Sequence, residues 1–275
     1  MPRLVRSGQV VTRLIRGGSG MKRALIGYSG FVGGNIARQA PFDDFYNSKN
    51  VEEVSGRAYD LAVCAAAPAE KWKANRHPET DLKSIERLER AVAAASIRKL
   101  VLISTIDVYP RPVEVDEYSA IDASQCQPYG AHRLMLERFL AERFDTVIIR
   151  LPGLYGDGLK KNMIYDFLHG NNVSQIHADS VYQFYSLDNI WRDLTRVMER
   201  SIKLMNFATE PVSAAEVARH AFGVEFTNRP TAPPARYDFR TRHAAVFNGA
   251  NGYLTSKADV LDGIRSFVER TRGKR

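Results

Sequence analysis

Short apolar runs alternate with longer segments of mixed polarity through the first 150 residues of the chain. The run Arg23-Ala24-Leu25-Ile26 is typical of a buried strand, and apolar positions then resume at helical spacing until Pro41, whose missing N–H ends the helix. Similar patterns predict strands at 44–46, 59–67, 99–105 and 146–149, and helices at 31–40, 81–95 and 129–143. A polar loop is expected at 70–80. Strand and helix therefore alternate, which predicts an α/β fold with a doubly wound parallel sheet.

The pattern loosens after Leu151, where shorter elements predict a smaller second lobe. Residues 226–255 contain several prolines and are expected to form irregular surface. Ser213 and Glu216 have the spacing of a capping box, and Ser256 is expected to cap the last helix. The predicted helices of this part lie at 162–168, at 187–199, after Ser213, and over 256–268. We expect this lobe to lie over the carboxyl edge of the sheet, where ligands bind in this architecture.

Three glycines, Gly27, Gly30 and Gly33, separate the first strand from the first helix. Without a Cβ, the backbone can approach a diphosphate while the free N–H groups of the new helix point at it. The spacing G-x-x-G-x-x-G differs from the commonest dinucleotide fingerprint, G-x-G-x-x-G. Taken alone, the stretch is either a phosphate-binding turn or a glycine-rich turn without a ligand.

The second strand ends about 20 residues beyond the first glycine, where this architecture meets the adenosine ribose of a dinucleotide. Here the chain reads Asn47, Ser48 and Lys49, without an acid that would accept the ribose 2′-OH and repel a 2′-phosphate. The sequence therefore favours NADP over NAD, although a solvated Lys49 would leave NAD as the cofactor. The third strand ends in residues small enough to let a cofactor lie against it, namely Ala65, Ala66 and Ala67.

Composition narrows the class of protein. The net charge of the 275 residues is +8, but residues 1–20 and 270–275 each carry four basic residues and no acid, so the remainder is formally neutral. Solvated ends are expected, and a nucleic-acid partner is not. No apolar run reaches the ~20 residues of a membrane span, and residues 1–20 lack the apolar core of a secretory signal. The two cysteines, Cys64 and Cys126, favour a cytoplasmic protein.

Two positions offer acid–base chemistry. Thr105 closes a predicted strand, and Tyr129 opens a predicted helix with Arg133 one turn later. A tyrosine with a pKa of about 10 is a poor base at neutral pH, but an adjacent fixed positive charge lowers the pKa of its phenol. Such a phenol could exchange a proton with a sugar hydroxyl while Thr105 hydrogen-bonds the same oxygen. The alternative is a tyrosine packed over a loop beside an exposed arginine.

Four motifs together resemble a known family. They are Gly27-x-x-Gly30-Phe31-Val32-Gly33, Ser104-Thr105-Ile106-Asp107-Val108-Tyr109, Tyr129-Gly130-x-x-Arg133 and Arg150-Leu151-Pro152-Gly153-Leu154-Tyr155-Gly156. In this order and spacing they resemble the extended short-chain dehydrogenase/reductase family, and within it the NAD-dependent epimerase/dehydratase group that acts on nucleotide sugars. Segments at 183–188, 206–208 and 252–264 extend the resemblance over nearly all of residues 21–269.

The resemblance implies a division of the chain into a Rossmann domain, a substrate lobe and two end segments. The Rossmann domain would span 21–152, with 176–199 returning to it, and the lobe would comprise 153–175 and 200–269. Residues 1–20 would be a basic extension and 270–275 a basic tail. The family further implies a bound NAD(P), a nucleotide-sugar substrate, no metal, and a homodimer as the assembly to expect.

Site residues follow from the resemblance by position. Thr105 is implied as the catalytic Ser/Thr and Tyr129 as the acid/base. Cofactor contacts are implied at Gly27, Ser29, Gly30, Phe31, Val32, Gly33, Tyr129, Arg133 and Pro152. They add to the cofactor positions already named at 47–49 and 65–67. Substrate contacts are implied at Asp107, Lys160, Lys161, Asn162 and Tyr185, unless the two lysines are merely solvated.

Two departures from the family pattern bear on function. Arg133 stands where the family has lysine, which preserves charge but not geometry. Dehydratases of the group carry an Asp-Glu pair after the threonine, whereas this chain has Ile106-Asp107, which counts against 4,6-dehydration. Asp107 is then a lone acid or base, or a structural hydrogen-bond acceptor. The sequence predicts an epimerase or reductase of a nucleotide-activated sugar, with a catalytically silent NAD(P)-binding protein as the alternative.

Overall fold

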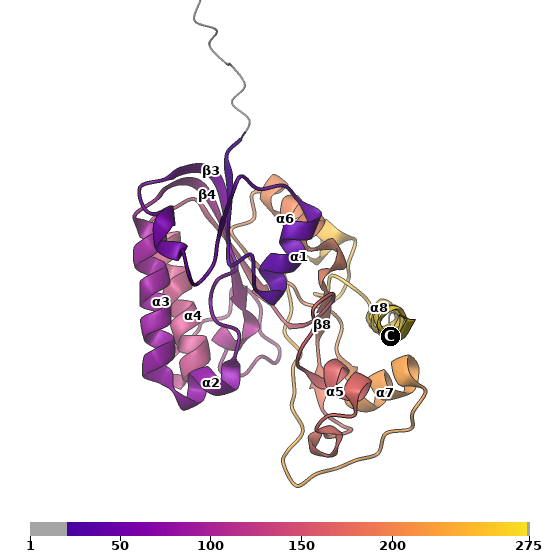
Figure 1. Ribbon diagram of the computed structural model, residues 1–275. Helices are drawn as coiled ribbons and strands as arrows, with labels where there is room; N and C mark the ends of the chain where they lie inside the picture. The colour runs from indigo at the N-terminus through magenta and orange to yellow at the C-terminus, as the bar shows by residue number, and fades with distance from the viewer. Residues whose placement is uncertain (1–20, 274–275) are drawn as a thin grey trace, which may run out of the picture.

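A parallel six-stranded sheet forms the centre of the protein (Figure 1). The structure is a computed structural model that describes residues 21–273. The strand order is β2-β1-β3-β4-β5-β9, and every neighbouring pair is parallel. The strands are β1 (Arg23–Ile26), β2 (Asp44–Tyr46), β3 (Ala58–Cys64), β4 (Ser96–Thr105), β5 (Thr146–Leu151) and β9 (Leu204–Asn206). The predicted doubly wound α/β fold is confirmed.

Helices cover both faces of this sheet. On one face, α1 (Phe31–Gln39) and α6 (Ile190–Glu199) bury Ile36 and Leu194 in one apolar cluster with the sheet. On the other, α3 (Pro78–Ala93) and α4 (Pro128–Ala141) share a second cluster with it and stand side by side in Figure 1. Because both faces are covered, the central strands read as unbroken apolar runs.

A second group of elements lies below and to the right of the sheet in Figure 1. It contains α5 (Met163–His169), α7 (Ala214–Phe222), α8 (Lys257–Gly273), the parallel pair β6 (Gly153–Tyr155) and β8 (Phe184–Ser186), and the antiparallel pair β7 (Val181–Tyr182) and β10 (Val212–Ser213). The capping box predicted at the start of α7 is present, with Ser213 and Glu216 each bonding the other's backbone N–H. No helix within residues 21–273 is long and apolar enough to cross a bilayer.

Several elements differ from the predictions. The expected polar loop at 70–80 contains α2 (Lys71–Arg76), whose single buried residue gives no apolar period, and Pro78 begins α3 three residues early. The third strand ends at Cys64 because residues 65–67 leave the sheet to line a cavity. β9 extends the sheet from within the predicted substrate lobe. Helix α8 continues to Gly273, into the segment predicted as a tail at 270–275, whereas residues 274–275 and the predicted extension 1–20 lie outside the described residues.

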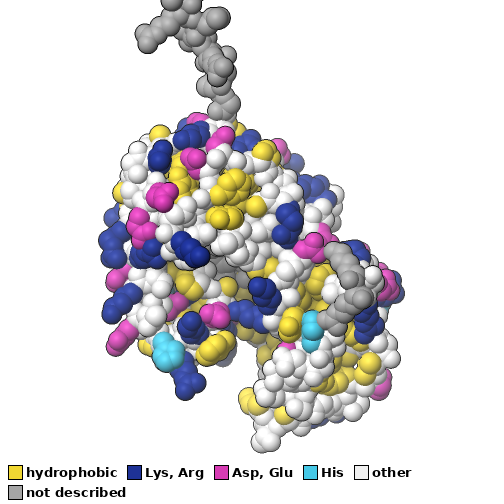
Figure 2. All heavy atoms as spheres, in the orientation of Figure 1, with side chains coloured by type: hydrophobic (Ala, Val, Ile, Leu, Met, Phe, Trp, Pro, Cys, Tyr) yellow, Lys and Arg dark blue, Asp and Glu magenta, His cyan; other side chains and the backbone are white. Residues whose placement is uncertain are grey.

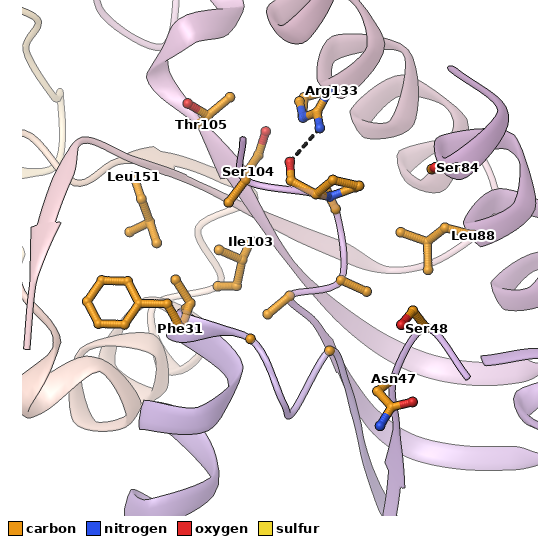
Figure 3. Close-up of a pocket in the computed structure, with 18 of the residues that line it drawn as sticks. Phe31, Asn47, Ser48, Ser84, Leu88, Ile103, Ser104, Thr105, Arg133 and Leu151 are labelled. Atoms are coloured by element: carbon orange, nitrogen blue, oxygen red, sulfur yellow. Dashed lines mark hydrogen bonds between the residues drawn. The ribbon is translucent and has the colours of Figure 1, made fainter. Parts of the chain in front are cut away.

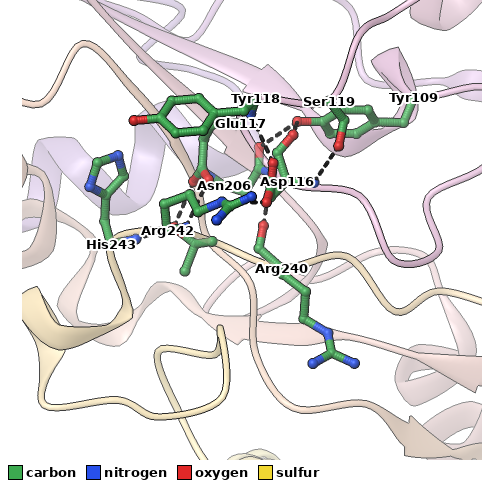
Figure 4. A network of polar contacts seen from close by, with 10 residues as sticks. Tyr109, Asp116, Glu117, Tyr118, Ser119, Asn206, Arg240, Arg242 and His243 are labelled. Carbon is green, nitrogen blue, oxygen red and sulfur yellow. Dashed lines mark hydrogen bonds and ion pairs between the residues drawn. The ribbon is translucent and has the colours of Figure 1, made fainter.

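The proline-rich segment 226–255 is irregular as predicted, apart from the short 3-10 helix η6 (Ala244–Phe247), but it is not all surface, because Phe239 and Leu254 are buried in apolar clusters. One of its polar contacts is with the Glu117 carboxylate (Figure 4). Glu117 accepts hydrogen bonds from the Asn206 backbone N–H at 2.8 Å, the Thr241 hydroxyl at 2.6 Å and the Arg242 backbone N–H at 2.9 Å. Asp116 adds an ion pair with Arg242. A loop after β4, the strand β9 and the late segment are therefore joined at one point.

Candidate active site

A cavity of about 480 Å³ lies at the carboxyl ends of the parallel strands. The chain leaves β1 toward β2 on one side and returns with β3 on the other, so the cavity lies at a topological switch point of the sheet. Every predicted cofactor contact lines it except Gly33 and Lys49. Figure 3 shows this arrangement, with Phe31 at one end and Asn47 and Ser48 at the other. In Figure 2 the surface is hollowed between the sheet and the second group of elements.

The three glycines of the turn serve different purposes. Gly27 has a φ of +94°, and a Cβ there would lie 2.4 Å from the Ala65 oxygen. A Cβ at Gly33 would lie 2.1 Å from the Gly27 oxygen, so this glycine allows α1 to begin against β1. Gly30 has ordinary backbone angles, and its Cβ would meet no atom closer than 3.3 Å. Its missing side chain leaves room in the cavity itself, beside a helix start that no side chain caps.

Thr105 and Tyr129 are brought together by a close approach of two elements. Thr105 ends β4, and its hydroxyl accepts the Asp107 N–H at 3.2 Å at the start of the 3-10 helix η2 (Ile106–Val108). A Cβ at Gly130 would lie 2.0 Å from the Asp107 oxygen, so the glycine after Tyr129 lets α4 begin directly against η2. Both Thr105 and Tyr129 line the cavity.

Arg133 is fixed beneath the phenol. Its guanidinium carbon lies 4.0 Å from the centre of the Tyr129 ring, and the side chain is 2% exposed. Four hydrogen bonds hold it, two to the Asp81 carboxylate, one to the Pro68 oxygen (dashed in Figure 3) and one to the Tyr129 oxygen. A guanidinium has five N–H donors, and the remaining one, Nε, is buried without a partner.

Asp81 balances the charge of Arg133. Burial by itself would raise the pKa of Asp81, but hydrogen bonds from Arg133 and His132 hold that pKa below its usual range. The pKa of Tyr129 is raised, because burial outweighs the lowering effect of Arg133 and of the Thr105 hydrogen bond. The phenol is therefore protonated at neutral pH.

A smaller cavity of about 220 Å³ lies beside the start of α4. Lys71 lies at its wall and donates to the Asp107 carboxylate at 2.7 Å and to the Tyr237 hydroxyl at 3.3 Å. Burial lowers the pKa of Lys71, but Asp107 and Tyr237 outweigh this effect and raise it, so the ammonium is charged. Asp107 thus has a cationic partner next to the Thr105–Tyr129 pair.

The other predicted substrate contacts line neither cavity, although two of them bond residues that line the larger one. Lys160 is exposed, and Lys161 donates to the Ala69 oxygen at 2.8 Å, joining the loop before α5 to the cavity edge. The Asn162 side chain caps α5 and donates to the Leu154 oxygen. The assignment of Tyr185 is corrected: this residue is 6% exposed, donates to Asp193 and packs in the apolar cluster under α6, because alternate β8 residues face opposite sides.

Four site residues have no signal in the sequence pattern. Lys71 lies in the stretch predicted as loop, and Tyr237 comes from the irregular segment. Asp81 and Arg87 are ordinary polar positions of a helix, and only the packing of α3 brings Asp81 to Arg133 and Arg87 to the cavity. Within residues 21–273 no group of three or more His, Cys, Asp or Glu side chains could hold a metal ion.

A protein-family model matches most of the chain. The model of the NAD dependent epimerase/dehydratase family matches residues 1–199. No curated protein sequence matches the chain.

Three solved structures share the fold, each covering 92% of this chain. A Bacillus anthracis dTDP-4-dehydrorhamnose reductase in complex with NADP is 18% identical with a TM-score of 0.70, and all of it is covered. The Thermotoga maritima UDP-glucose 4-epimerase is 15% identical with a TM-score of 0.69 and 99% covered. An NAD dependent NDP-hexosamine 5,6-dehydratase of tunicamycin biosynthesis is 17% identical with a TM-score of 0.70 and 98% covered. One fold thus carries three reactions in these proteins.

Proposed function

The chain belongs to the NAD dependent epimerase/dehydratase family, and from that premise we propose that it epimerises or reduces a nucleotide-activated sugar. It would use NAD(P) and act as an enzyme of the extended short-chain dehydrogenase type. The observation that carries the proposal is the meeting of the Thr105 hydroxyl and the Tyr129 phenol in a cavity at the switch point of the sheet. The choice of epimerisation or reduction over 4,6-dehydration rests on the sequence, where Ile106-Asp107 stands in place of the Asp-Glu pair of the dehydratases.

The residues of the larger cavity fit a dinucleotide. The uncapped start of α1 and the open space at Gly30 suit a diphosphate, because backbone N–H groups there face the cavity without a bulky side chain. The unpartnered Arg133 Nε suits a ribose hydroxyl, since a buried donor without an acceptor is costly. When bound, NAD(P) would accept or supply the hydride.

Tyr129 would move the proton in this scheme. Its raised pKa keeps the phenol protonated, so the residue is prepared to donate a proton to the oxygen of a keto-sugar. Thr105 would hold the same oxygen, and Arg133 would keep the phenol in place by packing under its ring. The Lys71–Asp107 pair would face the sugar from the smaller cavity.

The substitution Tyr129→Phe tests the proposal. It removes the proton donor but keeps the ring over Arg133, so we expect turnover of a keto-sugar nucleotide to fall by about 10²- to 10⁴-fold while NAD(P) affinity stays within about threefold. Steady-state kinetics and a cofactor titration on the same preparations measure the two effects. Unchanged turnover would remove Tyr129 from the mechanism.

One observation favours the catalytically silent alternative. The positive charge that the family places beside the phenol is balanced here by Asp81. The variant Arg133→Lys separates the two functions, because lysine restores the family residue but cannot make the four hydrogen bonds of the arginine. An active wild type that is slowed by the change supports an adapted enzyme. An inert wild type that gains activity supports the silent protein.

A further inference from the structure

The end of the larger cavity opposite Arg133 carries a second arginine. Arg87 on α3 lines this end with Asn47, Ser48 and Val51, and no aspartate or glutamate of residues 21–273 lines any part of the cavity. Lys49, to which the sequence assigns the 2′-phosphate, is exposed and outside the lining. The cation that faces the cavity here is therefore supplied by α3, about 40 residues from the turn that follows β2.

Glu52 fixes the position of Arg87. Its carboxylate accepts from Arg87 Nε and, at 2.8 Å, from Nη2, and the 3-10 helix η1 (Val51–Val54) that carries it packs on α3. Both carboxylate oxygens face the guanidinium, and Glu52 itself does not line the cavity. Among the described residues nothing accepts a hydrogen bond from Arg87 Nη1, and the Ser48 hydroxyl is equally unpaired.

We propose that Arg87 and Ser48 form the subsite for the 2′-phosphate of NADP and set the preference for NADP over NAD. This inference rests on the proposed function, because it takes the cavity to be a dinucleotide site. Arginine is suited to the task since its planar fork can hold a carboxylate on one edge and present further N–H groups to phosphate oxygens on another. A free ribose 2′-OH, by contrast, finds no acid here that would accept its hydrogen bond.

The test is the binding of NADP and NAD to the full chain, measured by calorimetry without any sugar. For Arg87→Gln, which shortens the side chain to a polar amide and removes its charge, we expect the Kd for NADP to rise by about 10- to 100-fold and that for NAD to change by less than about threefold. Arg87→Lys keeps the charge and should lose less. Lys49→Ala is the matched control and should leave both Kd values unchanged.

Two results would overturn the inference. An equal loss for both dinucleotides in Arg87→Gln would mean that the arginine contacts a part common to both, such as the adenine ring. An NADP preference that is lost in Lys49→Ala and kept in Arg87→Gln would mean that Lys49, in the turn after β2, binds the 2′-phosphate instead. Selective NADP binding by a chain that turns over no sugar would keep this subsite and overturn the proposed enzyme, so the two failures are distinguishable.

Discussion

At the scale of single residues, the exchange of lysine for arginine at position 133 requires a partner. A lysine would present a compact ammonium, whereas the guanidinium needs several acceptors once it is buried at 2% exposure. Asp81, Pro68 and the Tyr129 backbone supply them. The sequence predicts the departure from the family pattern but not its compensation, because Asp81 is 52 residues away and reaches Arg133 only through the packing of α3 on α4.

The raised pKa of Tyr129 predicts opposite pH profiles for the two directions of reaction. Reduction needs the protonated phenol, so its kcat/KM should lose nothing to Tyr129 ionisation until the pH exceeds the ordinary tyrosine pKa of about 10. Oxidation needs the phenolate and should rise about tenfold per pH unit between pH 7 and 9. The profiles of both directions, with Tyr129→Phe as the baseline, measure this. If kcat/KM for oxidation were already constant at pH 7, the pKa of Tyr129 would be lowered and not raised.

At the scale of elements, the predictable parts are those whose signal is local. Strands β1, β3, β4 and β5 are largely buried and show as apolar runs, and the caps of α7 and α8 depend on residues three positions apart. β9 has three residues and becomes a strand only because β5 offers a free edge. Helix α2 is too polar to show a helical period and is stabilised by contacts with α3 and α4.

The turn between β1 and α1 predicts different outcomes for two glycine variants. A Cβ at position 33 would overlap the backbone of the turn, so Gly33→Ala should lower the free energy of unfolding by about 1–3 kcal/mol or more. Gly30→Ala adds its Cβ toward the cavity, so it should unfold within about 0.5–1 kcal/mol of the wild type but bind NAD(P) at least about tenfold more weakly. Urea unfolding and cofactor titration distinguish the two. Equal loss of stability in both would contradict the separate purposes of these glycines.

At the scale of the whole molecule, the wall of the site on the substrate side is assembled from distant segments. Residues 105–121, β9 and the irregular segment 226–255 meet at Glu117 (Figure 4), and Tyr237 of that segment also contacts Lys71 of α2. The sequence predicts the irregularity of 226–255 but not its place, because the backbone bonds of Asp238 to residues 112 and 114 and the burial of Phe239 leave no local periodicity. The cofactor side, built from consecutive strand–helix units, is correspondingly easier to predict.

Glu117→Gln should weaken this assembly. Both carboxylate oxygens of Glu117 accept hydrogen bonds, whereas a glutamine amide has only one oxygen that can accept them. The free energy of unfolding should therefore fall by about 1–3 kcal/mol. Glu114→Gln is the matched control, because that exposed side chain makes no hydrogen bond within the described chain, and it should change stability by less than about 0.5 kcal/mol. Urea unfolding of both variants measures the difference. Equal effects would mean that Glu117 does not anchor the segment.

The hydrogen bonds that Glu117 accepts can form only late during synthesis on the ribosome. Its three partners lie 89, 124 and 125 residues further along the chain. At roughly 5–20 residues per second, the carboxylate emerges roughly 6–25 s before the Arg242 N–H that completes its set. During that interval the nascent chain can form the first five strands and the cofactor cavity, while the substrate wall is still missing. Under the proposed function, a nascent polypeptide would therefore form its dinucleotide pocket well before its sugar site.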